Sequence, residues 1–156
     1  MDRLTVRVLV CGESLRGDDA AAVIGARALP DDVQSFAEIA EVGQLSVEAL
    51  LDIPEGVSLI VADAAVGVAA GHAVTLPLAS VASRAPGGAP ASSHSMRPDQ
   101  VLALAEELRG SPLRGSFVGI GGAEFGFSEG LSTAVAAGLP AFVAALAAEI
   151  RRLAAE

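Results

Sequence analysis

Short apolar runs bounded by glycine or acidic residues are the clearest pattern along this chain. Residues 57–62 are nearly all apolar and are followed directly by Asp63. Such a run is typical of a central strand that is buried on both faces of a sheet. Residues 4–11, which Gly12 ends, and residues 116–121 predict two further strands of the same kind.

Two more segments predict strands, with less uniform composition. Residues 33–42 are a plausible strand that Gly43 breaks, and residues 72–78 follow a glycine-containing turn. The connection between residues 62 and 72 is too short for a helical crossover. We therefore expect residues 72–78 to pair antiparallel with the strand before them.

Helical patterns fill the segments between these strands. A helix is expected from Asp18 to about residue 29, because acids favour the first turn and Pro30 stops the helix. Ser46 is placed to cap a short helix that runs through residue 51. Pro98 is expected to begin a helix that runs to about residue 109.

Pro140 is expected to open the last helix, because proline is tolerated in a first helical turn. Both of the last two helices carry an apolar stripe at helical spacing. In the helix from residue 98 the stripe is Val101, Leu104, Ala105 and Leu108, with Glu106, Glu107 and Arg109 facing water. In the last helix it is Phe142, Val143, Leu146, Ile150 and Leu153.

The order of these elements is strand, helix, strand, helix, strand, strand, loop, helix, strand, helix. It predicts an α/β fold: a single domain over residues 1–156, built as a three-layer α/β/α sandwich around a five-stranded, mixed and mostly parallel sheet. Hydrophobic residues make up 52% of the chain, while aromatics are 3% and include neither Trp nor Tyr. The core must therefore be built from Val, Leu, Ile and Ala.

Charge and cysteine content narrow the function classes. The formal net charge of −9 argues against nucleic acid and against an anionic membrane surface, which both attract Lys and Arg. Cys11 is the single cysteine, so neither an internal disulfide nor a zinc site of several thiolates can form. We expect a reduced, cytoplasmic monomer with neither a targeting segment nor a membrane span.

Three residues could carry chemistry at one edge of the sheet. Ligands of open α/β sheets bind beyond the carboxyl ends of the strands, where Asp19 and Asp63 are expected. His94 lies near the end of a long loop, residues 79–97, that can fold over the same edge. Two carboxylates and an imidazole suit a divalent metal, which also offsets a repulsion of about 4 kcal/mol at ~4 Å and an effective dielectric of 20.

Each of these residues could also have a purely structural role or none. Asp18 and Asp19 could simply favour the start of a helix, and Asp63 could form a turn after its strand. His94 could be an exposed loop residue. His72 is expected to be structural or exposed, because it opens a strand away from the predicted edge.

Four segments, taken in order, resemble the maturation endopeptidases of nickel-iron hydrogenases. They are residues 8–19 (VLVCGESLRGDD), residues 59–64 (LIVADA), residues 93–94 (SH) and residues 125–135 (FGFSEGLSTAV). The resemblance implies an α/β/α sandwich and a metal site whose ligands fall on Asp19, Asp63 and His94. The sequence departs from the pattern of this family at Glu13, at Ala20 and at residues 41–44.

The resemblance further implies an activity: removal of a C-terminal peptide from the nickel-loaded large-subunit precursor of a hydrogenase. The nickel would be borne by the substrate and recognised by the three ligands. Peptide hydrolysis would use the metal as a Lewis acid or water activator, or use Asp19 or Asp63 as a general base. Two alternatives stay open: a non-catalytic, metal-sensing chaperone for the same precursor, and a different peptidase related to spore germination proteases.

Overall fold

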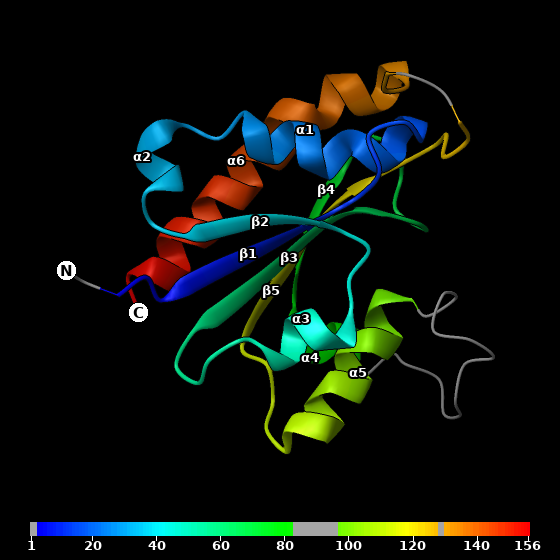
Figure 1. The fold of residues 1–156 in the computed structure, drawn as a ribbon. Coiled ribbons are helices and arrows are strands. Elements are labelled where there is room, and N and C mark those ends of the chain that lie inside the picture. Colours follow the sequence, from blue (N-terminus) through cyan, green and yellow to red (C-terminus); the bar gives the residue numbers. More distant parts are fainter. Residues whose placement is uncertain (1–2, 83–96, 128–129) are drawn as a thin grey trace.

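A twisted sheet forms the centre of the fold (Figure 1). The structure is a computed structural model that describes residues 3–82, 97–127 and 130–156, and five strands form one sheet within these ranges. The strands lie in the order β2-β1-β3-β5-β4. Their bounds are Val6–Cys11 for β1, Glu38–Gly43 for β2, Ser58–Ala65 for β3, Ala73–Pro77 for β4 and Gly115–Gly121 for β5.

The sheet is mixed and mostly parallel, as predicted. Strand β1 pairs parallel with β2 and β3, and β3 pairs parallel with β5, while β4 runs antiparallel to β5. The expected partner of β4 was wrong, because β1 and β5 already occupy both edges of β3. The connection to β4 crosses the end of β5 at Gly121, where an added Cβ would lie 2.1 Å from the Ala69 carbonyl oxygen.

Helices cover both faces of this sheet, which confirms the three-layer sandwich (Figure 1). One layer holds α1, α2 and α6, and the other holds α3, α4 and α5. The first layer comprises α1 (Ala21–Arg27), α2 (Asp31–Gln34) and α6 (Thr133–Ala154), with the 3₁₀ helix η1 (Gly17–Ala20) before α1. The second comprises α3 (Val47–Leu51), α4 (Leu78–Ala82) and α5 (Pro98–Arg109).

The alternation of side chains along β1 divides the core into two parts. Val6, Val8 and Val10 pack into the apolar cluster shared with α1 and α6. Leu9 and Cys11 point to the opposite face, into the cluster shared with α3, α4 and α5. This period of two follows from strand geometry. Aliphatic side chains fill most of both clusters, as the scarcity of aromatics predicted.

The strand predicted for residues 33–42 is shorter than expected. Residues Asp31–Gln34 form the short helix α2, and β2 begins only at Glu38. Pro30 precedes this helix, and Asp31 and Asp32 occupy its first turn, which favours a helix start. Val33 is fully buried against the first layer, so its apolar character serves a helix rather than a strand.

Helix α6 begins at Thr133, seven residues before the predicted start at Pro140, which therefore lies inside the helix. Its additional first turns pack against the protein: Val135 is fully buried, and a Cβ on Gly138 would lie 1.8 Å from the carbonyl oxygen of Gly71. These contacts favour the helical path despite the proline.

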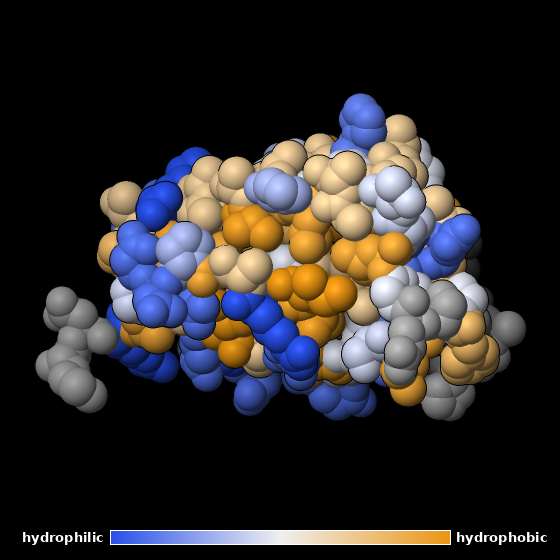
Figure 2. Space-filling model, turned by 90° about the horizontal axis from the view of Figure 1, so that it is seen from above, coloured by the Kyte–Doolittle hydropathy of each residue, from blue (hydrophilic) through white to orange (hydrophobic). Residues whose placement is uncertain are grey.

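Helix α6 is long and apolar enough to cross a membrane, by length and composition only. Core helices of soluble proteins share this length and composition. The buried side chains of α6, including Phe142 and Ile150, pack in the core, and most of its exposed residues are alanine. Apolar side chains gather in the middle of the face that α1 and α6 form (Figure 2).

The buried face of α5 differs from the predicted stripe. Leu104 and Leu108 are 36% and 61% exposed, whereas Leu102 is fully buried. The reason is that α5 packs against both α3 and α4, which shifts its buried face around the helix. Arg109, expected to face water, donates hydrogen bonds to the carbonyl oxygens of Leu50 and Ile53 at 3.1 and 2.7 Å.

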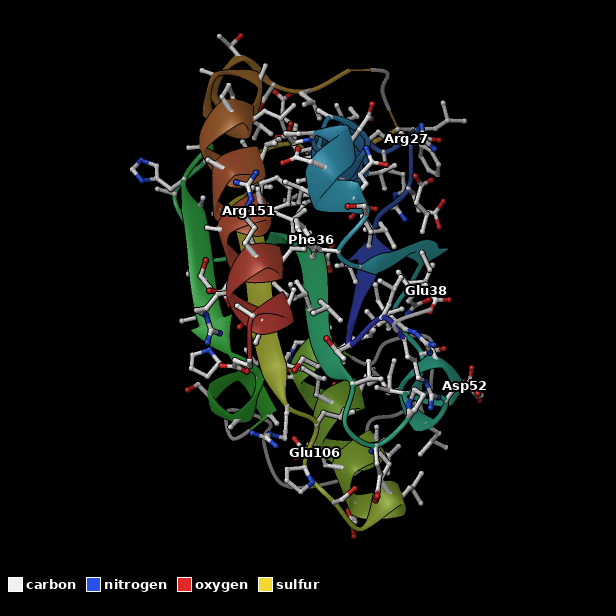
Figure 3. The ribbon with its side chains drawn as sticks, turned by 90° about the vertical axis from the view of Figure 1, so that its left-hand side faces the viewer. Arg27, Phe36, Glu38, Asp52, Glu106 and Arg151 are labelled. Atoms are coloured by element: carbon white, nitrogen blue, oxygen red, sulfur yellow. The ribbon has the colours of Figure 1, made fainter. Side chains whose placement is uncertain are left out.

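Ion pairs lie at the outer surfaces of the layers. Arg27 on α1 donates two hydrogen bonds to the Glu41 carboxylate at 2.7 and 2.8 Å. Arg151 on α6 reaches Asp32 on α2 at 3.1 Å. Figure 3 shows Arg27 and Arg151 on the helices of the first layer. Exposed pairs of this kind contribute about 0–1 kcal/mol each, so the packed core carries most of the stability.

Candidate active site

Asp63 lies within the central strand β3, two residues before the strand ends. Its neighbour on β5 in the sheet register is Gly119. By alternation along β3, its side chain points to the same face as Leu59 and Val61, the face that α3, α4 and α5 cover. One carboxylate oxygen of Asp63 accepts a hydrogen bond from the backbone N–H of Ala64 at 2.8 Å.

Asp19 reaches the same edge from η1, which follows the end of β1. Its Oδ2 accepts a hydrogen bond from the backbone N–H of Glu13 at 2.9 Å. Gly12 permits the chain to turn back here, with φ +134°, and an added Cβ would lie 2.0 Å from the Asp19 carbonyl oxygen. A residue larger than glycine would therefore push η1 away from the end of β1.

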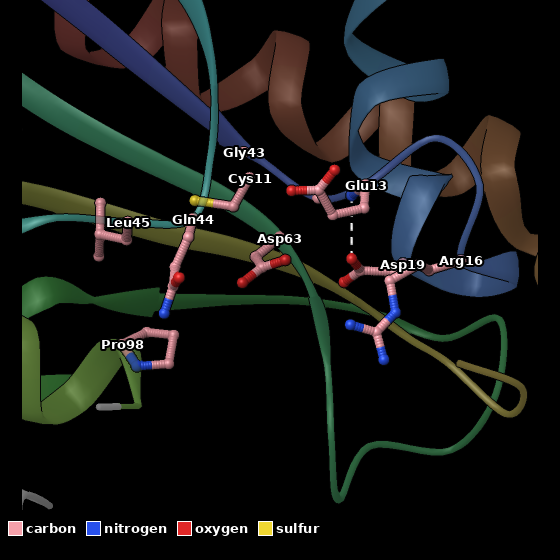
Figure 4. Close-up of a pocket in the computed structure, with 10 residues that line it drawn as sticks. Cys11, Glu13, Arg16, Asp19, Gly43, Gln44, Leu45, Asp63 and Pro98 are labelled. Atoms are coloured by element: carbon pink, nitrogen blue, oxygen red, sulfur yellow. Dashed lines mark hydrogen bonds between the residues drawn. The ribbon is translucent and has the colours of Figure 1, made fainter. Parts of the chain in front are cut away.

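The two carboxylates line one cavity of about 340 Å³ at the carboxyl ends of β1, β2 and β3 (Figure 4). Asp63 points into it from the sheet, and Asp19 and Arg16 reach it from the η1 side. The other lining residues are Cys11, Gly12, Glu13, Gly43, Gln44, Leu45 and Pro98. The prediction that Asp19 and Asp63 meet at this edge agrees with this geometry.

Burial and the neighbouring carboxylate change how Asp63 titrates. Burial, and then the negative charge of Asp19, raise the pKa of Asp63 from 3.8 to about 7, although the hydrogen bond from Ala64 opposes the shift. Near neutral pH the side chain therefore exchanges a proton readily. Groups with such a pKa are suited to accept or donate a proton in a reaction.

Cys11 lies against the same carboxylates and remains a thiol. Burial raises its pKa well above the usual range, and the charges of Asp63 and Asp19 raise it further. A thiolate is the nucleophilic form of cysteine, so Cys11 is unsuited to nucleophilic attack at neutral pH. Cys11 is 2% exposed and packs as a small apolar residue in the core cluster shared with α3, α4 and α5.

Asp18 has a structural role that was not predicted from the sequence. Its buried carboxylate accepts hydrogen bonds from the backbone N–H groups of Ala123, Glu124 and Ser132 and from the Ser132 hydroxyl, at 2.7–2.8 Å. Burial alone would raise the pKa of Asp18, but these hydrogen bonds outweigh it and hold the pKa below its usual value. Asp18 thus fixes η1 against the segment that follows β5.

His94, the third predicted ligand, lies outside the described residues. Within the described ranges, no group of three or more His, Cys, Asp or Glu side chains is arranged to hold a metal ion. The metal site of Asp19, Asp63 and His94 therefore remains a prediction, for which the structure supplies two of the three side chains in one cavity.

His72 is exposed, as expected, but lies at a different edge of the sheet from the one expected. Because β4 is antiparallel to the other strands, its first residues lie at the same edge of the sheet as the cavity, and the Gly121 N–H donates to the His72 carbonyl oxygen at 2.9 Å. The side chain of His72 is exposed and is absent from the lining of the cavity.

Three further polar side chains line the cavity and were not among the predicted site residues. Glu13 and Arg16 follow β1, and Gln44 follows β2. The rule that selected Asp63 also applies to them, because each lies just beyond the carboxyl end of a parallel strand. Arg16 also lies over the ring of Phe127, with its guanidinium carbon 5.2 Å from the ring centroid.

Comparison with known proteins gives a consistent family of solved structures. No protein-family model and no curated protein sequence matches the chain. The hydrogenase maturating endopeptidase HybD from E. coli superposes with a TM-score of 0.73 and 25% identity, covering 94% of this chain and 92% of that one. The [NiFe] hydrogenase maturation protease HybD from Thermococcus kodakarensis gives a TM-score of 0.63 and 20% identity over 90% and 95% of the two chains.

A third match is the maturation protease HycI from Thermococcus kodakarensis, with a TM-score of 0.63 and 19% identity over 95% and 93% of the two chains. All three matches cover nearly the whole of both chains, so the similarity is one of the complete fold. The chain therefore has the fold of the nickel-iron hydrogenase maturation endopeptidases, which confirms the resemblance seen in its sequence.

Proposed function

We propose that this protein is an endopeptidase that removes a C-terminal peptide from the nickel-loaded large-subunit precursor of a nickel-iron hydrogenase. The observation that carries the proposal is the meeting of Asp19 and Asp63 in one cavity at the carboxyl edge of the sheet. The fold is shared with proteins described as hydrogenase maturation endopeptidases, which supports a processing role.

The nickel ion enters this proposal as part of the substrate. Asp19 and Asp63 bring two carboxylates to one cavity, and His94 would supply an imidazole, a donor set that suits a divalent cation. Burial first, and then repulsion from Asp19, raise the pKa of Asp63, and a cation there would offset the repulsion. A precursor without nickel offers these side chains nothing to coordinate, so recognition would report that the metal has been inserted.

Hydrolysis of the peptide requires a water molecule to attack the scissile carbonyl carbon. The new C–O bond forms, the C–N bond breaks, and the leaving amine takes up a proton. Two routes fit the cavity. The substrate's nickel could polarise the carbonyl or the water, or Asp63 or Asp19 could accept the water's proton as a general base.

A processing assay tests the proposal. The precursor is the large subunit that co-purifies with the tagged chain from its native cells, prepared with and without nickel. We expect the wild-type protein to shorten the nickel-loaded precursor, which mass spectrometry reads as loss of a C-terminal peptide. The Asp63→Asn variant should leave the same precursor intact.

Each outcome separates the alternatives. Equal shortening of nickel-loaded and nickel-free precursor would remove the role of the metal in recognition. Binding of the nickel-loaded precursor without shortening would identify the protein as a metal-sensing chaperone instead. Absence of both binding and shortening would reject the hydrogenase large subunit as the partner.

A further inference from the structure

A second cavity, of about 470 Å³, adjoins the first and shares both carboxylates. Asp19 and Asp63 line one part of it, and most of its remaining lining is apolar. The apolar lining includes Val74 and Leu76 on β4 and Phe117 on β5. We call this cavity the apolar groove. It runs from the candidate active site across β5 towards the edge strand β4.

A glycine beside Asp63 makes room for an aromatic ring on the floor of the groove. Gly119 on β5 is the register partner of Asp63 on β3 and of Val74 on β4, so it lies between these two residues in the sheet. The ring of Phe117 lies over Gly119, since an added Cβ there would approach the Phe117 Cε1 to 2.7 Å. The ring thus forms an apolar floor between the carboxylate of Asp63 and the edge strand.

The alternation of β4 supplies one wall of the groove. Val74 and Leu76 are partly buried and line the groove, whereas Ala73, Thr75 and Pro77 are exposed and point to the other face. Arg97 also lines the groove and donates hydrogen bonds to both carboxylate oxygens of Asp99 at 3.1 and 3.2 Å. The charge of this arginine is therefore already matched by a neighbour.

We propose that the apolar groove binds an apolar side chain of the processed polypeptide, next to the bond that is cleaved. This inference rests on the proposed peptidase function and names the specificity of its site. The groove is continuous with the cavity of Asp19 and Asp63, so a main chain held at the carboxylates places a neighbouring side chain over Phe117. An acidic side chain would lose its hydration on this floor and would meet the carboxylates of Asp19 and Asp63, while Arg97 is already paired with Asp99.

The test compares two substitutions at adjacent positions of β4. Val74→Asp places a carboxylate in the groove, and Thr75→Asp places the same group on the opposite, exposed face. We expect Val74→Asp to lower kcat/KM for the nickel-loaded precursor by roughly 10- to 100-fold, mainly through KM, from the lost burial of one aliphatic side chain. The Thr75→Asp variant should process the precursor at a rate close to wild type.

A charge exchange with the substrate gives a readout that altered folding cannot produce. Replacing each residue that flanks the cleaved bond with Asp, one at a time, should give one precursor that the wild type processes poorly. Val74→Lys should restore processing of that precursor in preference to the unmodified one. Equal effects of Val74→Asp and Thr75→Asp, together with no rescue by Val74→Lys, would overturn the inference.

The outcomes also separate this inference from the proposed function. If wild-type protein binds the precursor without shortening it, the peptidase proposal fails, and weaker binding by Val74→Asp than by Thr75→Asp still supports an apolar docking groove. If wild-type protein neither binds nor shortens the precursor, both proposals fail. Sedimentation of the chain alone tests a second copy as occupant: a self-association that Val74→Asp abolishes would contradict the substrate assignment.

Discussion

Asp18 and Ser132 lie 114 residues apart in the chain and are joined by two hydrogen bonds. The Ser132 N–H donates to Oδ1 of Asp18 at 2.7 Å, and the Ser132 hydroxyl donates to Oδ2 at 2.8 Å. This contact links η1 to the residue that precedes α6. Since Asp19 follows directly in η1, the buried carboxylate of Asp18 fixes the segment from which Asp19 reaches the cavity.

We predict that Asp18→Ala lowers the free energy of unfolding by roughly 3–5 kcal/mol. The substitution removes a charged acceptor from three backbone N–H groups and one hydroxyl, and unpaired buried donors are costly. Urea unfolding followed by circular dichroism measures the change. Asp19→Ala is the matched control, because the Asp19 carboxylate accepts one backbone hydrogen bond, from Glu13. A similar loss of unfolding free energy in both variants would contradict the structural role of Asp18.

Asp63 should make stability depend on pH. Its pKa rises from the 3.8 of an unperturbed carboxyl to about 7 in the folded protein, because of burial first and the charge of Asp19 second. Between these two pKa values the folded state holds a proton that the unfolded state releases, so the free energy of unfolding falls as pH rises. The destabilisation caused by the ionised Asp63 is complete above about pH 7.

The Asp63→Asn variant removes this cost, since the amide carries no charge at any pH in the range. The free energy of unfolding of this variant minus that of the wild type should therefore grow by roughly 1–3 kcal/mol from pH 5 to pH 8. Denaturant unfolding at a series of pH values, with a chelator present, measures the difference. A difference that stays constant across the range would show that the ionised carboxylate is not penalised in the fold.

Much of the fold could be predicted from sequence because strong local patterns determined it. The apolar runs that became β1, β3 and β5 lie in the middle of the sheet, where burial on both faces removes ambiguity. The errors came from tertiary contacts. Val33 is apolar enough for a strand but is buried by a helix, and the turns of α6 before Pro140 form because Gly138 packs against Gly71.

The candidate site was predictable to the extent that it follows from strand direction. Asp19 and Asp63 were selected because carboxyl ends of parallel strands meet at one edge, and the cavity contains both. The role of Asp18 could not be found this way, since its partners at Ala123, Glu124 and Ser132 are more than 100 residues distant. His72 was placed away from this edge although its strand was expected to be antiparallel, and an antiparallel strand begins at the carboxyl edge of its parallel neighbours.

Helix α6 offers two alanine substitutions with opposite expected effects. Pro140→Ala should raise the free energy of unfolding by roughly 1–3 kcal/mol, because Pro140 is exposed inside the helix and lacks the N–H that helical bonding uses. Gly138→Ala should lower it, because the new Cβ would lie 1.8 Å from the Gly71 carbonyl oxygen. Thermal unfolding of both variants checks the signs, and stabilisation by Gly138→Ala would contradict the close approach of α6 to residue 71.

The chain contains two histidines, His72 and His94, which allow a matched test of metal recognition. His94→Ala should reduce processing of the nickel-loaded precursor by at least about tenfold, because loss of a metal ligand costs at least as much as loss of its supporting partner. His72 is exposed at the same edge of the sheet but does not line the cavity, so His72→Ala should process the precursor as wild type does. Initial rates on nickel-loaded precursor measure both. If both variants retained full activity, the ion would have to be recognised by Asp19 and Asp63 without an imidazole, and a preference for nickel-loaded over nickel-free precursor would then have to come from the carboxylates alone.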